Sequence, residues 1–193
     1  MSEPDAHVQA LLDGLREARD EFLKAVGDVD PGLRTAPGLV GEWSARELLA
    51  HVGYWAGHAA EALHRAEQGE LAEFGRDDLS VDERNVVVAR VAAEADYATA
   101  ASREQGAYQA FATRLGAVER DTLEERDADG DTLAEIIAFD GADHYREHML
   151  DVRAWFDGTD ASDDEANKDD EIADDEDAAA DEDAAADDQP EDA

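Results

Sequence analysis

Histidines at helical spacing are the residues of this chain best suited to chemistry. His144 and His148 are four residues apart, so a helix places their side chains on one face, one turn apart. Counted at 3.6 residues per turn, they share one apolar stripe with Leu133, Ile137 and Trp155. A core that holds two stacked imidazoles must satisfy both of them, and His51, on a second amphipathic stretch, provides a third.

Three imidazoles that converge inside a helical bundle suit a divalent metal ion. The chain has no cysteine, and a three-histidine set without thiolates favours zinc, nickel or iron(II), with one coordination position left open. We therefore predict that His51, His144 and His148 are metal ligands. The competing interpretation is that they are core or partly exposed histidines that bind nothing.

Two carboxylates close to these histidines are candidate catalytic residues. Glu147 completes an H-x-x-E-H run, the zinc signature of inverted zincin peptidases, in which the glutamate is a general base. Those enzymes are large and the signature is short, so Glu147 is either a base of another reaction or a solvated carboxylate. Asp140 lies one turn before His144, where it could accept a hydrogen bond from a histidine's second nitrogen, as metal ligands usually require. It could equally be an ordinary edge aspartate.

The remaining histidines and aromatic residues have weaker signals. His58 lies two turns, about 10 Å, beyond His51, too far to share its metal ion, so it is at most a pocket residue. No role is assigned to His7 or His64. Three aromatic residues either line a pocket beside the metal or belong to the core: Tyr54, Trp55 and Tyr108.

Apolar periodicity predicts the helices that position these side chains. Helical patterns cover about residues 5–27, 44–69, 80–95, 97–118 and 133–157, and three of them begin with an S/T-x-x-E capping box: Ser44 with Glu47, Ser80 with Glu83, and Thr132 with Glu135. No stretch alternates with period two. We predict an all-α fold, a four-helix bundle over residues 1–157. The roughly 30 residues between the second and third long helices allow a long crossover.

The formal charge of −36 has two equal sources. Residues 157–193 contain 19 acids and one base, and residues 1–156 contain 33 acids and 15 bases, so each part carries −18. The low-complexity segment 158–193 is predicted to be a disordered acidic tail. Two lysines against fourteen arginines, with abundant Asp, Glu and Ala, resemble proteins from cytoplasms kept at high salt. We interpret the acidity as halophilic adaptation and, because phosphate contacts need clustered bases, exclude nucleic acid as a partner.

Apolar content and the N-terminal residues bear on location. The first residues lack the basic start and apolar run of a signal peptide, and no stretch approaches 18 consecutive apolar residues. We expect a cytoplasmic protein with no membrane partner. The absence of cysteine also excludes disulfides and a thiolate nucleophile.

Three segments together resemble DinB-like proteins. EWSARELLAH (42–51) resembles the family's second helix, and HYREHMLDVRAWF (144–156) resembles the closing helix with two further metal histidines. The stretch DERNVVVARVAAEADYATA (82–100) is similar to the ClbS/DfsB-type branch, in which a helix containing an asparagine precedes the third long helix. The resemblance implies a crossover bundle, often a homodimer, with three histidines around a divalent metal.

Function is expected to depend on that metal. Characterised members of the family include thiol S-transferases that use mycothiol or bacillithiol, a maleylpyruvate isomerase and a toxin-resistance hydrolase. The resemblance therefore implies a metal-dependent transferase or hydrolase that acts on a small electrophilic molecule. Because the chain has no cysteine, any transferred thiol would come from a low-molecular-weight cosubstrate. The alternatives are a non-catalytic bundle that binds a small molecule or serves a stress response, and a purely structural dimeric bundle.

Overall fold

Helices begin where the capping boxes predict them. The structure, a computed structural model, describes residues 5–76 and 79–158. Reciprocal side-chain caps start α2 (Ala45–Gln68) at Ser44, α3 (Val81–Ala93) at Ser80, and α5 (Leu133–Ile137) at Thr132. Gly69 ends α2 with a positive φ of 71°, which a residue without a Cβ adopts without strain. The described part of the chain forms no named strand, so the predicted all-α class is confirmed.

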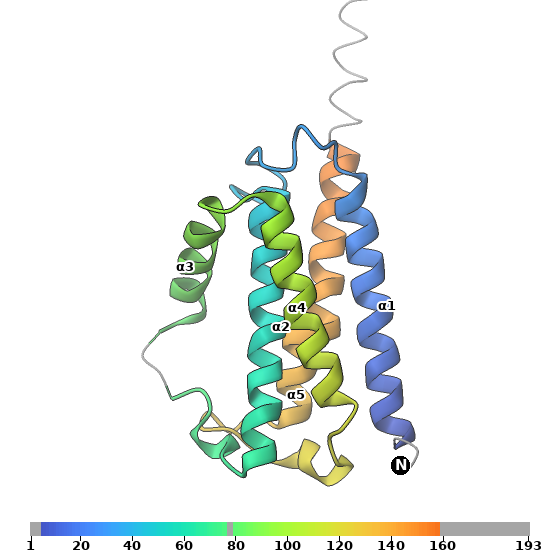
Figure 1. The fold of residues 1–193 in the computed structure, drawn as a ribbon, viewed down its shortest axis with the longest axis vertical. Coiled ribbons are helices and arrows are strands. Elements are labelled where there is room, and N and C mark those ends of the chain that lie inside the picture. Colours follow the sequence, from blue (N-terminus) through green and yellow to red (C-terminus); the bar gives the residue numbers. More distant parts are fainter. Residues whose placement is uncertain (1–4, 77–78, 159–193) are drawn as a thin grey trace, which may run out of the picture. The chain divides into compact units, whose positions relative to one another are not determined.

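The long crossover makes two neighbouring helices parallel. α1 (Ala6–Asp28), α2, α4 (Tyr97–Leu115) and the last helical stretch form the four-helix bundle, with α3 beside α2 (Figure 1). The starts of α2 and α4 meet where Arg46 donates to the carbonyl of Ala95 at 3.2 Å, and their ends meet where Arg114 pairs with Glu67 at 2.6 Å. After α2 the chain passes through η1 (Leu71–Glu73) and α3 and returns to the end of the bundle at which α2 begins, where α4 starts. The predicted crossover is therefore confirmed.

The last long helix is interrupted, which the sequence did not predict. After α5, residues Ala138–Asp143 form a π-helical turn, η3, and residues 144–158 are again helical. At Gly141 the backbone leaves helical geometry, and a Cβ there would lie 2.8 Å from the ring of Phe111. Glycine therefore lets this turn approach α4 closely. A π turn adds a residue to the helix and rotates the residues after it, and such turns are frequent at functional sites.

An ion pair is buried among the helices. Glu104 of α4 is 1% exposed and accepts two hydrogen bonds from Arg19 of α1, at 2.7 and 2.8 Å. The hydroxyl of Tyr145, which is fully buried, donates to the same carboxylate at 2.7 Å. Gly53 of α2 faces this point, since a Cβ there would lie 2.9 Å from the Cα of Glu104. The close approach of α2 and α4 thus depends on a residue without a side chain.

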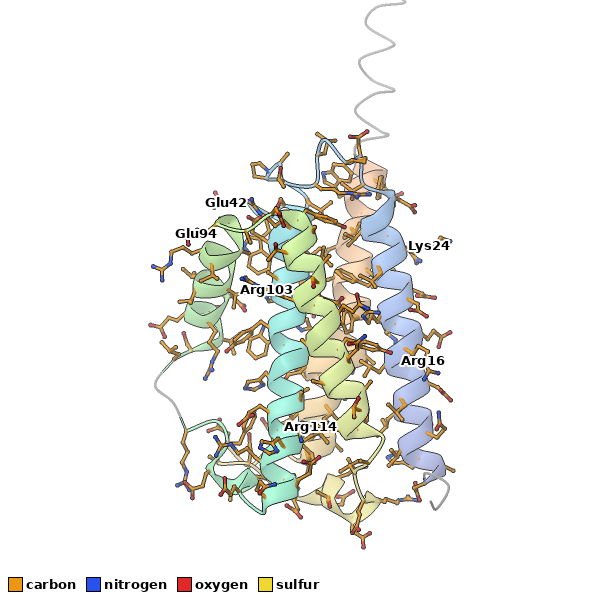
Figure 2. The ribbon with its side chains drawn as sticks, in the orientation of Figure 1. Arg16, Lys24, Glu42, Glu94, Arg103 and Arg114 are labelled. Atoms are coloured by element: carbon orange, nitrogen blue, oxygen red, sulfur yellow. The ribbon has the colours of Figure 1, made fainter. Side chains whose placement is uncertain are left out.

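The charged side chains lie mainly on the outside of the bundle. Arg16 and Lys24 project from the exposed side of α1 (Figure 2). Within the described ranges, no helix is both long enough and apolar enough to cross a membrane. The chain divides into a unit of residues 1–155 and a second of 156–193, of which only 156–158 are described. The predicted disordered tail, 158–193, therefore lies outside the described residues except for Gly158 and stays a prediction.

Stability should rise with salt. Two like charges about 8 Å apart in water repel by about 0.5 kcal/mol. The Debye length falls from roughly 10 Å at 0.1 M to 3 Å at 1 M, so about ten such pairs would give up about 2 kcal/mol of repulsion. We expect the unfolding free energy of the chain shortened after residue 160, which still carries the −18 of residues 1–156, to increase by that order between 0.1 and 1 M potassium chloride. A flat profile in salt-dependent melting curves would show that the arginines already neutralise the acids locally.

Candidate metal centre

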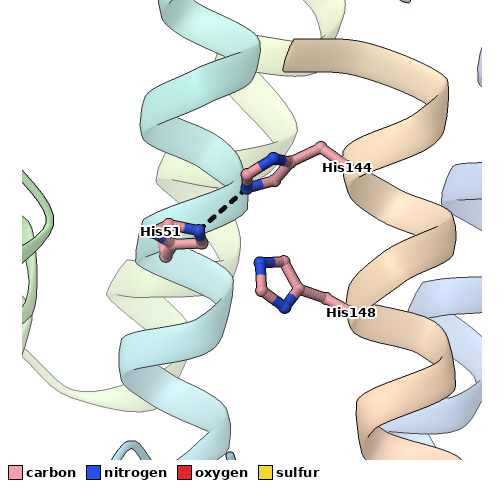
Figure 3. Close-up of side chains that lie close together, drawn as sticks. All are labelled: His51, His144 and His148. Atoms are coloured by element: carbon pink, nitrogen blue, oxygen red, sulfur yellow. Dashed lines mark hydrogen bonds between the residues drawn. The ribbon is translucent and has the colours of Figure 1, made fainter. Parts of the chain in front are cut away.

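The three predicted ligands converge. His51 comes from α2, and His144 and His148 come from the helical stretch after the π turn (Figure 3). They are 4%, 7% and 8% exposed, and one ring nitrogen from each lies within 4.8 Å of the others. The Nε2 atoms of His51 and His144 are 2.8 Å apart. Of the residues that the structure describes, these three form the group of imidazoles that could hold a metal ion.

Two tryptophans pack against the histidines. The Trp43 ring centroid lies 4.7 Å from that of His51, and Trp55 lies 6.4 Å from His51 and 6.1 Å from His144. The indole N–H of Trp55 donates to the side-chain oxygen of Asn85 in α3 at 3.1 Å. Asn85, in the short helix of the crossover, therefore orients the indole of Trp55 that packs against the histidines. Trp43 directly precedes the Ser44 cap, so the same local sequence that starts α2 also places this indole.

Burial keeps two imidazoles neutral. Desolvation, with a further contribution from His144 and His148, lowers the pKa of His51 to about 3, although the nearby amide of Asn85 acts in the opposite direction. Desolvation and the proximity of His148 lower the pKa of His144 to about 4. At neutral pH both rings are uncharged, which is the form that binds metals.

One of the three histidines has the outer acceptor that a ligand usually needs. Nδ1 of His148 bonds to Asp151 at 2.8 Å, while its other ring nitrogen turns toward His51 and His144 (Figure 3). Nδ1 of His51 and Nδ1 of His144 are buried with no hydrogen-bond partner among the described residues. Because a metal ligand is normally oriented through its second nitrogen, this set orients His148 by a hydrogen bond and the other two rings by packing.

Asp140 is hydrogen-bonded to none of the three predicted ligands. Its carboxylate is 3% exposed and accepts a hydrogen bond of 2.7 Å from Nδ1 of His58. Burial raises the pKa of Asp140, against the opposing effect of His58. Asp140 therefore does bond to a histidine, as predicted, but that histidine is His58 and not one of the three predicted ligands. Glu147 is exposed on the helix surface.

The three aromatic candidates lie in different parts of the bundle. Trp55 is 4% exposed and lies between His58 and the three histidines, with its ring 5.2 Å from that of His58. Tyr54 accepts from Arg84 at 3.3 Å. The guanidinium carbon of Arg19 lies 4.2 Å from the ring centroid of Tyr108. Tyr108 therefore packs against the buried ion pair and not against the histidines. Of the three aromatic candidates, Trp55 borders the cluster.

The histidine set fits a divalent ion chemically. Each ring has a nitrogen near a common point, and two tryptophan rings pack against the cluster. The present 2.8 Å between two Nε2 atoms is a direct hydrogen bond, whereas two nitrogens bound to one tetrahedral zinc ion are about 3.3 Å apart. His51 and His144 would therefore separate by about 0.5 Å. Small rotations of the two imidazole side chains can increase the distance between their Nε2 atoms by this amount.

Comparison with known proteins identifies the fold. No family model matches the chain, and no curated protein matches it. The crystal structure of the colibactin self-resistance protein ClbS in complex with double-stranded DNA matches 77% of this chain and 94% of its own, at 14% identity and a TM-score of 0.63. This chain has the fold of ClbS.

Two further structures share the ClbS fold. An uncharacterised protein from Escherichia coli UTI89 is 13% identical, with a TM-score of 0.65, and the match covers 83% of this chain and 96% of that one. A protein from Streptococcus pneumoniae is 10% identical, with a TM-score of 0.66, over 81% and 92% of the two chains. The resemblance to the ClbS-type branch inferred from the sequence is thus confirmed at the level of the fold.

The exclusion of nucleic acid as a partner is wrong. The ClbS structure is a complex with double-stranded DNA, so a bundle of this fold can bind a duplex. The exclusion rested on the acidic balance of residues 1–156 and on the view that phosphate contacts need clustered bases, and neither decides such binding. Phosphate contacts depend instead on a few local groups, above all on arginines, and fourteen of the sixteen basic residues here are arginines.

Proposed function

We propose that His51, His144 and His148 hold a divalent metal ion, and that the protein is a metal-dependent enzyme of the transferase or hydrolase type. The observation that carries the proposal is the buried cluster of three imidazoles, in which two ring nitrogens lack any partner among the described residues. A core that served packing alone would gain more from apolar side chains, because each unpaired buried nitrogen costs about 1–3 kcal/mol. The substrate would be a small electrophilic molecule.

Different residues would bind the ion, orient its ligands and exclude water. His51, His144 and His148 would bind the ion, and Asp151 would keep the proton of His148 on Nδ1 so that the other nitrogen can ligate. Trp43 and Trp55 would exclude water from two sides. A bound divalent ion supplies Lewis acidity, which lowers the pKa of water or of an external thiol. Glu147, which directly precedes His148, would remain the candidate proton carrier, because the carboxylate of Asp140 is already bonded to His58.

Metal binding should be lost when any one ligand is removed. We expect purified wild-type protein incubated with zinc or nickel to retain about one ion per chain, and His51→Ala, His144→Ala and His148→Ala to lose it, because three ligands leave none to spare. His64→Ala, an exposed histidine of α2, is the matched control and should retain the ion. Elemental analysis after gel filtration measures the ratio. Wild-type protein that stays metal-free would contradict the proposal.

Turnover separates the enzyme from the alternative, a bundle that binds a small molecule without reacting. We expect metal-loaded protein to consume an epoxide or cyclopropane electrophile in the presence of water or a low-molecular-weight thiol, and His148→Ala to lose this activity. Binding of the electrophile without consumption, in protein that does hold metal, would favour the non-catalytic alternative.

A further inference from the structure

A cavity of about 570 Å³ lies beside the histidine cluster and is not used by it. Its walls come from α2, from the residues after η1, from the start of α3, from the loop 127–131, and from α5 with the π turn. Trp55 and Phe139 both line the cavity, and their ring centroids lie 6.1 and 6.2 Å from that of His144. The volume lies in the range of small-molecule sites.

Aromatic rings form much of the lining. Trp55, Phe74 and Phe139 all face the cavity, and the rings of Phe74 and His58 lie 4.6 Å apart. Phe139 is 61% exposed, although a large aromatic side chain would normally be buried. An exposed ring at the edge of a cavity offers contact area to a ligand, and aromatic faces attract cations through the quadrupole of the ring.

The same cavity carries a net negative charge. Its lining includes five carboxyl groups and one guanidinium, that of Arg84, which gives −4 with His58 counted as neutral. The carboxyl groups belong to Asp127, Asp129, Asp131, Glu135 and Asp140. Arg84 already donates to the hydroxyl of Tyr54. In the described part of the chain, neither Asp129 nor Asp131 has an ion-pair partner.

The acidic loop has a fixed shape. One carboxylate oxygen of Asp127 accepts hydrogen bonds from the backbone N–H groups of residues 129, 130 and 131, at 2.9–3.0 Å. The N–H of Ala128 donates to the carbonyl of Phe74 at 3.2 Å, which joins the loop to the aromatic wall. The negative and the aromatic parts of the lining are therefore positioned relative to each other before any ligand arrives.

A buried pair supplies a directional acceptor. Asp140, which is 3% exposed, accepts from Nδ1 of His58, so with an ionised Asp140 the proton of His58 resides on Nδ1. Nε2 is then a lone-pair acceptor on a ring that lines the cavity. An N–H donor of a ligand can use this acceptor.

We propose that this cavity binds a small organic ammonium ion with an apolar body. The apolar body would stack on the rings of Trp55, Phe74 and Phe139, and the cation would lie between those rings and the carboxylates of the loop 127–131. An ammonium N–H would donate to His58. The proposal needs no metal at His51, His144 and His148, so it stands or falls separately from the proposed function.

The test compares a cation with its uncharged analogue. Phenethylammonium and 2-phenylethanol have similar bodies and differ in charge. We expect the full-length, metal-free protein in 1 M potassium chloride, where general attraction to an acidic surface is screened, to bind the ammonium about tenfold more tightly than the alcohol. The indole N–H resonance of Trp55, assigned with Trp55→Phe, should shift during an NMR titration. Equal affinity for both compounds, or no shift, would overturn the proposal.

Matched variants locate the site. Asp129→Asn with Asp131→Asn should reduce the preference for the ammonium at least about fivefold, whereas Asp20→Asn with Asp28→Asn on α1, which removes the same charge outside the cavity, should leave it unchanged. Phe139→Ala should weaken binding of both compounds, and Leu150→Ala, equally exposed but outside the cavity, should not. Equal effects of the two charge variants would show general counterion attraction and overturn the proposal. Because Phe139 is exposed, its variant should fold even if a charge variant does not.

Discussion

Replacing Glu104 by alanine should destabilise the bundle by about 3–5 kcal/mol, the range observed when one partner of a buried ion pair is removed. The variant would leave the guanidinium of Arg19, whose side chain is 13% exposed, without its two hydrogen bonds. It would also leave the hydroxyl of Tyr145 without an acceptor. Burial, the largest cause of the raised pKa of Tyr145, persists in the variant, so this hydroxyl keeps its proton and cannot balance the charge of Arg19. Chemical denaturation at neutral pH measures the loss.

Two comparisons test the cause of that loss. Glu17→Ala, an exposed glutamate of α1, should change the unfolding free energy by less than about 0.5 kcal/mol. The double variant Arg19→Met with Glu104→Met, which removes both charges and fills the space with apolar atoms, should be more stable than Glu104→Ala. If Glu104→Ala proves no worse than Glu17→Ala, the ion pair contributes nothing and the helices are held by apolar packing.

The place of each histidine on its own helix could be predicted because that signal is local, whereas their convergence depends on how the helices pack. The spacing of His144 and His148 forces them onto one helical face, and the Ser44–Glu47 box fixes where α2 begins and hence where His51 lies. The crossover could be predicted because a connection of that length permits it. These inferences need only helical geometry and caps, both of which act over a few residues.

Other features depend on tertiary contacts that periodicity does not record. The π turn at Ala138–Asp143 rotates Asp140 toward His58, so a carboxylate assigned to the neighbourhood of His144 serves another ring. Glu104 looks like a surface residue in the sequence and is buried because Arg19 and Tyr145, 85 and 41 residues away in the chain, neutralise and bind it. The pairing of distant polar residues has no local signature.

Lowering the pH should destabilise the metal-free protein before most carboxylates titrate. Buried His51 and His144 have pKa values of about 3 and 4, whereas a histidine in the unfolded chain has a pKa of about 6.5. Between pH 8 and pH 5 the unfolded state gains protons on both residues and the folded state gains almost none, so stability present above pH 6.5 is lost as the pH falls. We expect this difference to cost about 3–4 kcal/mol by pH 5.

A neutral variant isolates that contribution from all other titrating groups. His51→Gln with His144→Gln cannot titrate at these positions, so its unfolding free energy, measured in the presence of a chelator, should fall less between pH 8 and pH 5 than that of the wild type. His64→Gln, an exposed histidine, should behave like the wild type. Added zinc should stabilise the wild type more at pH 8 than at pH 5, because protons and metal compete for the same nitrogens. Parallel profiles for the wild type and the double variant would mean that the two imidazoles take up protons at the same pH in the folded protein as in the unfolded chain, and burial would then not keep them neutral at pH 5.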